Sequence, residues 1–318
     1  MANQRELRGR KSLAAVNGFL LLNKPAGMTS NQALQKVKRL LQARKAGHTG
    51  SLDPAATGML PLCFGEATKV CAYLLEADKT YRVTARLGEA TDTADADGQI
   101  IASKPVPDLD VPRWQAILKG FEGDILQVPP MYSALKKDGK RLYELARKGE
   151  TVERAARPVR IHTIDLLEAS GSRLVFRVHC SKGTYVRTLV EDIAEAAGTV
   201  AHTAKLHRES LGEFRAAEML DMAGIEKAAL EGPEYLRGQL LPTDAALSDW
   251  PACRVSEPDA ERFSGGQAVS CDTTGSGLIK VYGPTELFLG IGELTGDGGV
   301  APKRIFMLER ELGNSGAG

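Results

Sequence analysis

Residues 47–60 read GHTGSLDPAATGML, a segment with a single carboxylate, Asp53. The three glycines and the proline of this segment favour a fixed loop over a helix or a strand interior. Its apolar residues Leu52, Met59 and Leu60 can hold the loop against a core. A lone acid held in this way suits a nucleophile better than a metal site, which needs several clustered ligands. The alternative is an ordinary surface loop with a turn-forming Asp-Pro pair.

Three further blocks accompany this loop along the chain. Residues 23–30 read NKPAGMTS, residues 79–82 read KTYR and residues 182–189 read KGTYVRTL. In this order, and together with the Asp53 loop, they resemble the TruB family of tRNA pseudouridine synthases. The resemblance extends over residues 18–215, and a looser match continues through the C-terminal part of the chain.

The resemblance implies an α+β fold. We expect a pseudouridine-synthase-like mixed, mainly antiparallel sheet flanked by helices, plus a small β-rich C-terminal domain that resembles a PUA domain. A flexible basic arm is expected over residues 1–17. The catalytic domain is expected over 18–249, with a basic, thumb-like insertion at about 122–158. The PUA-like domain is expected over 250–318.

Local patterns predict the elements of this fold. Residues 18–22, GFLLL, are continuously apolar and indicate a buried strand. Thr29 or Ser30 can cap a helix whose apolar face recurs at positions 33, 37, 40 and 41. Similar patterns predict helices over 67–77 and 141–148 and a helix that ends near 198. Strands are predicted over 81–87, 100–102, 174–180, 267–269, 278–282, 288–292 and 304–307. The acidic turn 92–98 has a superficial likeness to a calcium loop but lacks its ligand pattern.

Charge is unevenly distributed, although the net charge of the chain is only +1. Residues 1–82 carry 13 Lys and Arg against 5 Asp and Glu, and residues 133–160 carry 9 against 4. Residues 216–318 reverse the balance, with 8 against 16. Two basic blocks of this kind favour a surface that follows nucleic-acid phosphates. Solvated helix faces are the alternative, and they explain part of the first block.

Composition is that of an ordinary soluble globular protein. Hydrophobic residues make up 43% and charged residues 25% of the 318-residue chain. The apolar run 18–22 is too short to span a membrane, and the five cysteines lack the CxxC pairing of a zinc site. We therefore expect a cytoplasmic protein with no metal. Neither a dinucleotide fingerprint nor a phosphate-binding loop is present, so no cofactor is expected.

The resemblance assigns a catalytic role to Asp53, Tyr81 and Arg187. Uridine isomerisation requires an ionised carboxylate at the junction of sugar and base, and Asp53 takes that role. Arg187 can orient this carboxylate by a two-point hydrogen bond and favour its charged form, whereas an ion pair with Glu191 is the alternative. Tyr81 can stack on an extruded base or transfer a proton, and a core aromatic is the alternative.

Substrate contacts are assigned in the same way. His48 fills the stacking position left by the flipped base, and Tyr185 and Leu206 contact the extruded uridine. Lys24 and Lys69 support the loop or contact phosphate. In the thumb-like insertion, the cations expected on the RNA backbone are Lys136, Lys137, Lys140 and Arg141.

Other polar residues receive no role. The remaining histidines, His162, His179, His202 and His207, are scattered along the chain. His207 stands where many family members have arginine, and Ser51 where alanine is common.

Three functional hypotheses follow. The first is a stand-alone tRNA pseudouridine synthase acting on uridine 55 of the T-loop, with tRNA as its partner, no membrane contact and no obligatory protein partner; we expect a monomer. The second is an RNA-guided synthase subunit of the H/ACA type, which needs accessory proteins. The third is a tRNA-folding chaperone in which catalysis is secondary.

Overall fold

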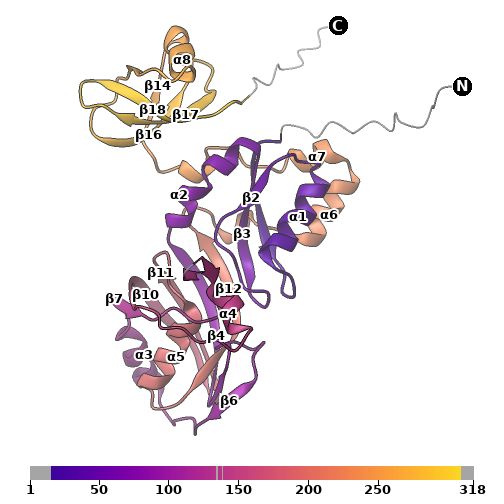
Figure 1. Cartoon of the computed structure of the whole chain (residues 1–318), viewed down its shortest axis with the longest axis vertical. Coiled ribbons are helices and arrows are strands. Elements are labelled where there is room, and N and C mark those ends of the chain that lie inside the picture. Colours follow the sequence, from indigo (N-terminus) through magenta and orange to yellow (C-terminus); the bar gives the residue numbers. More distant parts are fainter. Residues whose placement is uncertain (1–15, 134, 138, 309–318) are drawn as a thin grey trace, which may run out of the picture.

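A nine-stranded mixed sheet forms the body of the protein in a computed structural model, which describes residues 16–133, 135–137 and 139–308 (Figure 1). Its strands are β1 (Gly18–Lys24), β2 (Ala46–His48), β3 (Thr57–Phe64), β4 (Lys79–Leu87), β7 (Gly123–Gln127), β10 (Arg157–Ser170), β11 (Arg173–Cys180), β12 (Ala201–Leu211) and β13 (Leu220–Asp221). The order is β13-β1-β3-β12-β4-β11-β10-β7, and β2 pairs with β3. The β1–β13 and β12–β3 pairs are parallel, so the mixed, mainly antiparallel sheet is confirmed.

Helices cover one face of this sheet. They are α1 (Ser30–Leu40), α3 (Val111–Lys119), α5 (Val186–Ala196), α6 (Met222–Leu230) and α7 (Pro233–Arg237). Each contributes buried apolar side chains to one cluster that also contains Leu20 and Leu22 of β1 and Val83 of β4. Burying these side chains removes a large apolar area from water, which is the main force that holds the helices on the sheet.

The opposite face is covered only over part of its width. Phe19 and Leu21 alternate with the residues of the first cluster and pack with helix α2 (Cys71–Glu76) in a second one. Farther along the sheet, β4 alternates between buried and more exposed residues, with Tyr81 on the helix-covered side and Arg82 on the other. The β4–β11–β10 part of the sheet therefore exposes a polar back face.

Several predicted elements are confirmed with small changes of boundary. Helix α1 starts at the predicted cap. The Thr29 hydroxyl accepts a hydrogen bond from Gln32 N, and Gln32 Oε1 accepts one from Thr29 N. The predicted helix 67–77 is divided into a 3₁₀ turn, Gly65–Lys69, and α2. In the insertion, α4 (Leu142–Ala146) is shorter than predicted.

The C-terminal region forms a second, smaller sheet of five strands. Its elements are β14 (Ala252–Arg254), α8 (Glu257–Ser264), β15 (Val269–Ser270), β16 (Gly277–Tyr282), β17 (Phe288–Leu294) and β18 (Gly299–Ile305). The strand predicted over 304–307 is present, but β18 begins five residues earlier and ends at Ile305. Gly296 and Gly298 take positive φ and complete a tight turn, so β18 starts directly after it.

This C-terminal module lies at one end of the long sheet, at the top of Figure 1. It has a core of its own around Phe263 and Ile279. Phe288, Ile291 and Phe306 belong instead to the cluster that contains Phe19, so the module is packed against the β1 side of the sheet.

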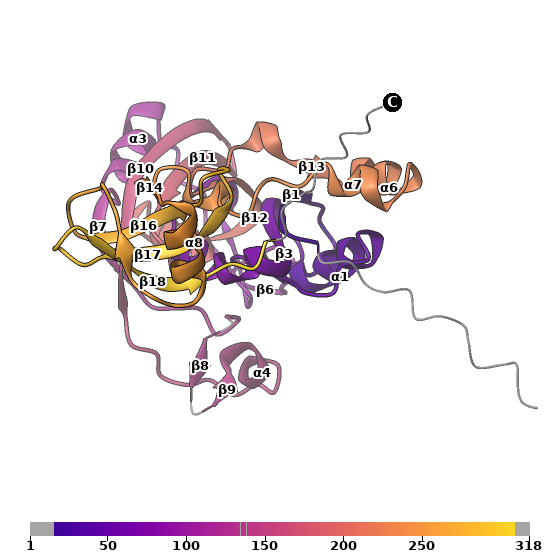
Figure 2. The same cartoon turned by 90° about the horizontal axis from the view of Figure 1, so that it is seen from above.

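The insertion that follows β7 extends away from the body. It contains a short hairpin of β8 (Lys136–Lys137) and β9 (Lys140–Arg141), followed by α4, and these elements stand apart from the sheet in Figure 2. A second small hairpin pairs β5 (Glu89–Thr91) with β6 (Ile100–Ser103). Of the basic arm expected over 1–17, residues 1–15 lie outside the described residues. None of the helices described here combines the length and hydropathy that crossing a bilayer requires.

Gly58 generates the first testable prediction, because two constraints meet there. Its φ is +99°, and an added Cβ would lie 2.3 Å from the Arg208 carbonyl oxygen of the neighbouring strand β12. We expect Gly58→Ala to lower the free energy of unfolding by about 3 kcal/mol or more, since unfavourable φ costs about 1–2 kcal/mol and overpacking about 1–3 kcal/mol. Urea denaturation measures the loss.

Gly171→Ala is the matched control. Gly171 also has positive φ, +51°, but no heavy atom lies within 4 Å of its would-be Cβ. It should lose only about 1–2 kcal/mol. Equal losses in the two variants would show that the close approach at Gly58 has no energetic weight.

Candidate active site

The Asp53 loop is fixed by hydrogen bonds to three of its backbone carbonyls. Arg208 Nη2 donates to Gly50 O at 2.9 Å, and the Ser30 hydroxyl donates to Leu52 O at 3.2 Å. Lys24 Nζ donates to Pro54 O at 3.2 Å. Every second carbonyl from residue 50 to residue 54 is thus held from a different element, so the loop presents Asp53 from a rigid frame.

Arg208 is one of the deeply buried anchors, with 1% of its surface exposed. Its Nε also donates to Met59 O at 2.6 Å. The register of the sheet pairs Arg208 with Tyr81 on β4 and with Gly58 on β3. One guanidinium therefore connects the loop, β3 and the strand that carries Tyr81.

Arg187 lies beside Asp53, as the sequence predicted. It is the second residue of α5, and its Nε is 3.2 Å from Asp53 Oδ2. Its Nη1 is 3.5 Å from Asp95 Oδ2. The guanidinium lies between two carboxylates and does not form the expected two-point hydrogen bond with Asp53 alone.

Backbone carbonyls complete the surroundings of Arg187. Its Nη1 donates to Thr93 O at 3.0 Å and its Nη2 to Tyr132 O at 2.7 Å. The side chain of Arg187 is 8% exposed, whereas that of Asp53 is 43% exposed. Backbone carbonyls therefore fix the buried guanidinium of Arg187, while the carboxylate of Asp53 remains accessible from solvent.

Electrostatics at Asp53 differ from the sequence expectation. Burial raises the pKa of the Asp53 carboxyl above its ordinary value, and Asp95 and Asp97 raise it further. Arg187 opposes this effect but does not reverse it. The site thus holds an acid that is harder to ionise than a free aspartate, next to a cation that favours the charged form.

Tyr81 is buried on the helix-covered face of β4, close to this group. Burial raises the pKa of its phenol, and the nearby Arg208 guanidinium opposes that rise. The Tyr81 hydroxyl therefore stays protonated at neutral pH and can donate a proton or a hydrogen bond.

His48 ends β2 and pairs with Leu62 of β3. Burial, and then the charge of Arg208, lower the pKa of its imidazole. Its Nδ1 is buried and has no hydrogen-bond partner among the described residues. A neutral ring held in this way fits a stacking role better than acid–base work.

Tyr185 and Leu206 lie on elements that adjoin the site. Tyr185 caps α5, and its backbone exchanges two hydrogen bonds with the Gln127 side chain, at 3.0 Å and 3.3 Å. Leu206 is half-buried on β12 opposite Val83 and packs against the main core. Leu206 thus shares β12 with Arg208 and pairs with β4, which carries Tyr81, whereas Tyr185 is fixed to β7 through Gln127.

The two lysines assigned to the site differ in their surroundings. Lys24 is fully buried and burial lowers its pKa to about 8. It donates to Pro25 O and Met28 O in the turn before α1 and to Pro54 O in the Asp53 loop, so it ties these two segments together and has no surface for phosphate. Lys69 contacts Glu66, donates to Ile305 O at 2.6 Å and lies over the Phe306 ring. These contacts join Lys69 to the C-terminal module and not to the Asp53 loop.

The cations of the insertion are not part of this group. Lys136, Lys140 and Arg141 are exposed on the β8–β9 hairpin, and the side chain of Lys137 lies outside the described part of the chain. Their exposure is compatible with a phosphate contact.

Comparisons with known proteins identify the family of the chain. Residues 38–186 match the TruB family pseudouridylate synthase N-terminal domain, 187–248 the tRNA pseudouridylate synthase B C-terminal domain, and 251–306 the C-terminal domain of pseudouridine synthase II TruB. The chain is 50% identical over 298 residues to tRNA pseudouridine synthase B of Pseudomonas putida, covering 92% of this chain and 97% of that protein. The chain belongs to the TruB family of pseudouridine synthases.

Other TruB relatives and solved structures extend the likeness. The tRNA pseudouridine synthase B of Nitrosococcus oceani is 48% identical over 306 residues, covering 96% of this chain and 98% of the relative. A chain from the crystal structure of a Cbf5–Nop10–Gar1 complex superposes with a TM-score of 0.72 and 25% identity, covering 92% of this chain and 86% of that one. The fold is therefore shared with proteins of distant sequence.

Sequence reasoning missed two residues of this TruB site. Arg208 was not singled out, because a buried arginine has the same sequence signal as an exposed one. Asp95 lies in the acidic turn that was examined only as a calcium loop. A count of cations near apolar strand positions could have drawn attention to Arg208. The role of Asp95 could be recognised only once the fold was known.

This geometry predicts that removing the charge of Arg187 and removing that of Asp95 shift the Asp53 pKa in opposite directions. Arg187 lowers that pKa and Asp95 raises it. Arg187→Gln should therefore raise the Asp53 pKa above the wild-type value, so that the carboxylate ionises only at higher pH. Asp95→Asn should lower it, because a like charge is removed and Arg187 keeps Asp53 as its carboxylate partner.

Carboxyl ¹³C chemical shifts followed over a pH titration measure both changes without requiring turnover. The Asp53 signal is assigned by its absence in Asp53→Asn. Shifts of the same sign in the two variants would contradict the electrostatic description of the site.

Proposed function

We propose that this chain isomerises uridine to pseudouridine at position 55 in the T-loop of tRNA, with Asp53 as the catalytic carboxylate. The observation that carries the proposal is the contrast in exposure between the groups of the site. Asp53 is the half-exposed reactive group, while Arg187, Tyr81 and Arg208 are buried around it. The names of the bacterial relatives support tRNA as the substrate.

The chemistry asked of these residues is limited. The N1–C1′ bond breaks, the uracil turns, and C5 joins C1′, after which the proton on C5 is lost and N1 carries one. No electrons are gained or lost overall, so the reaction requires no redox partner. Asp53 acts at the junction of sugar and base, Arg187 holds the carboxylate, and the protonated Tyr81 faces the base.

Extrusion of the target base is the second requirement. A stacked uridine must leave the RNA loop before Asp53 can reach the sugar. His48, kept neutral by burial, supplies a flat ring that fills the vacated position, and Tyr185 and Leu206 contact the extruded base. Lys24 supports the loop through its carbonyl contacts.

The insertion is assigned to the RNA backbone. Its exposed cations lie on a hairpin that stands apart from the sheet, where a phosphate backbone can reach them (Figure 2). The C-terminal module is acidic in sequence, so we assign the main electrostatic contribution to the insertion.

An RNA-guided function is the second candidate, because the chain shares its fold with a chain of a Cbf5–Nop10–Gar1 complex and with a chain of an H/ACA RNP bound to a substrate RNA. The stand-alone function is favoured by identity of about 50% that covers nearly all of each bacterial relative. Incubating the purified chain alone with a tRNA transcript tritiated at uridine C5 separates the two. Stoichiometric release mapped to the T-loop supports the stand-alone enzyme, and tight binding without release supports the guided one.

Asp53→Asn is the direct test of the catalytic assignment. An amide keeps the shape of the side chain but cannot act as a nucleophile, so turnover should fall by about 10⁴-fold or more. Tritium release measures turnover, and filter binding measures tRNA affinity, which should change little.

Asp97→Asn is the control for charge alone. Asp97 is exposed and contributes to the field at Asp53, but it is placed outside the group that touches the substrate. Its variant should keep turnover within a few fold of the wild type. An active Asp53→Asn enzyme would remove Asp53 as the catalytic carboxylate.

Neutralising the insertion tests the phosphate contacts. Changing Lys136, Lys137, Lys140 and Arg141 together to Gln should weaken tRNA binding and flatten its salt dependence. The slope of log K against log salt should fall by about 0.7–0.9 for each lost phosphate contact.

A variant with four cations changed elsewhere gives the comparison. Lys119, Arg254, Arg262 and Lys303 are exposed, and each is already paired with a carboxylate. Their neutralisation should leave the slope nearly unchanged. If both variants change the slope equally, the insertion has no special role in binding.

A further inference from the structure

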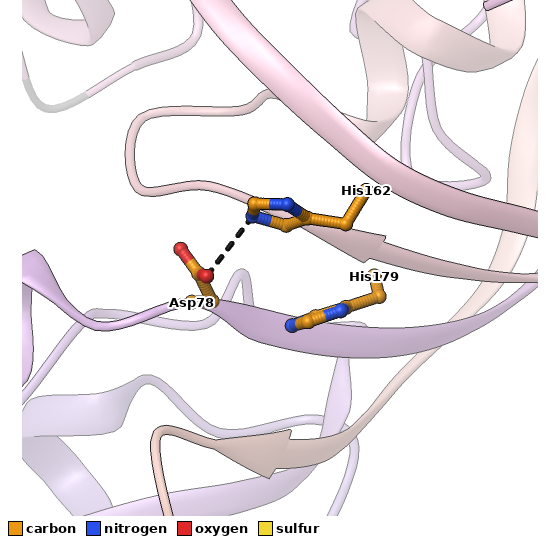
Figure 3. Close-up of side chains that lie close together, drawn as sticks. All are labelled: Asp78, His162 and His179. Atoms are coloured by element: carbon orange, nitrogen blue, oxygen red, sulfur yellow. Dashed lines mark ion pairs between the residues drawn. The ribbon is translucent and has the colours of Figure 1, made fainter. Parts of the chain in front are cut away.

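A group of three metal-ligating side chains lies away from the proposed active site. Asp78, His162 and His179 each offer a ligand atom, and these atoms all lie within 4.8 Å of one another (Figure 3). Asp78 precedes β4, His162 belongs to β10 and His179 to β11. The two histidines received no role in the sequence analysis, where they were noted only as scattered along the chain.

The fold brings them together through an irregularity in the sheet. The register of β10 on β11 shifts between Ile161 and Thr163, so His162 is the extra residue of a β-bulge. Bulges redirect a side chain, and here the His162 ring meets that of His179 with centroids 4.7 Å apart. Without the bulge, His162 would take the alternating direction of an ordinary strand residue.

The contact between His162 and Asp78 is incomplete as a hydrogen bond. His162 Nε2 approaches Asp78 Oδ2 at 2.9 Å. The same nitrogen is buried and makes no well-directed hydrogen bond to any described residue. The carboxylate oxygen carries lone pairs, so a ring nitrogen at this distance either carries a proton or shares a cation with it.

We propose that Asp78, His162 and His179 bind a divalent transition-metal ion of the Zn²⁺ type. Two imidazoles and one carboxylate are a donor set that Zn²⁺ accepts, with a fourth position left for water. Ligand atoms around tetrahedral Zn²⁺ lie about 3.3 Å apart. The widest pair must therefore close by about 1.5 Å, which rotation of these incompletely buried side chains allows.

The charge around the cluster permits a cation. Asp78 and His179 line a surface pocket of about 410 Å³ that also includes Arg177 and Arg215. Arg177 Nε is paired with Glu209 Oε2 at 2.7 Å, and Arg215 Nη2 lies 3.5 Å from Glu213 Oε2. Both arginines are thus compensated by carboxylates of their own. Burial also lowers the pKa of His179, which keeps its ring neutral and available as a ligand.

The site is separate from the proposed catalytic group. His179 lies on β11 between Val178 and Cys180, whose side chains are buried in the helix-covered core together with Tyr81. Strand alternation places His179 on the opposite, polar face. The ion would link β10, β11 and the entry to β4 on that face, and turnover should not depend on it.

Zn²⁺ affinity of the full chain tests the proposal, measured by competition with a chromophoric chelator. One ion should bind per chain, and His162→Ala, His179→Ala and Asp78→Asn should each weaken binding by about 10-fold or more. His207→Ala, which removes a histidine outside the cluster, is the matched control and should bind as the wild type does. Circular dichroism verifies that each variant is folded, and the three ligands come from separate elements, so one unfolded variant leaves two to be tested.

Co²⁺ identifies the donors. Binding through imidazole and carboxylate gives no thiolate-to-metal charge-transfer band, whereas binding through the free cysteines gives one. The proposal is overturned if the wild type binds no stoichiometric Zn²⁺, if the cluster variants bind as tightly as His207→Ala, or if the Co²⁺ complex shows the thiolate band.

Discussion

The Arg208 guanidinium donates to the carbonyls of Gly50 and Met59 from a position closed to solvent. A charge in such a place is costly unless its donors are satisfied, and here the backbone of the Asp53 loop satisfies them. The loop and the guanidinium therefore require each other. Burial is the main cause of the pKa shifts of Lys24, His48 and Tyr81, and the charge of Arg208 makes a further contribution that lowers the pKa of each.

The elements that the sequence predicted well are those with a local cause. The strand at β1 follows from a continuous apolar run, and the start of α1 follows from the hydroxyl of Thr29 and the amide of Gln32. The pairing of Asp53 with Arg187 was also foreseen, although it joins positions 134 residues apart. That success came from family resemblance and not from periodicity, because no local pattern connects a loop with a helix so distant in sequence.

What the sequence could not give are the contacts created by packing alone. Asp95 reaches Arg187 because the turn after β5 folds back over α5, and nothing near Asp95 in the sequence encodes that approach. His162 meets His179 because one residue is added to β10, which changes the direction of a side chain without changing the hydrophobic pattern. The expected two-point Arg187–Asp53 bond failed for the same reason, since the guanidinium has to serve several acceptors.

The hydrogen bond from Arg187 to the carbonyl of Tyr132 has a thermodynamic consequence. Tyr132 lies at the base of the insertion, so the same arginine is attached to the Asp53 carboxylate and to the root of the segment assigned to the RNA backbone. A ligand that moves Tyr132 must also disturb its hydrogen bond to Arg187, and so change the interaction of Arg187 with the Asp53 carboxylate. By reciprocity, a change in the ionisation of Asp53 must alter the affinity for that ligand by the same factor. The affinity for a ligand at the insertion and the ionisation of Asp53 are in this sense coupled.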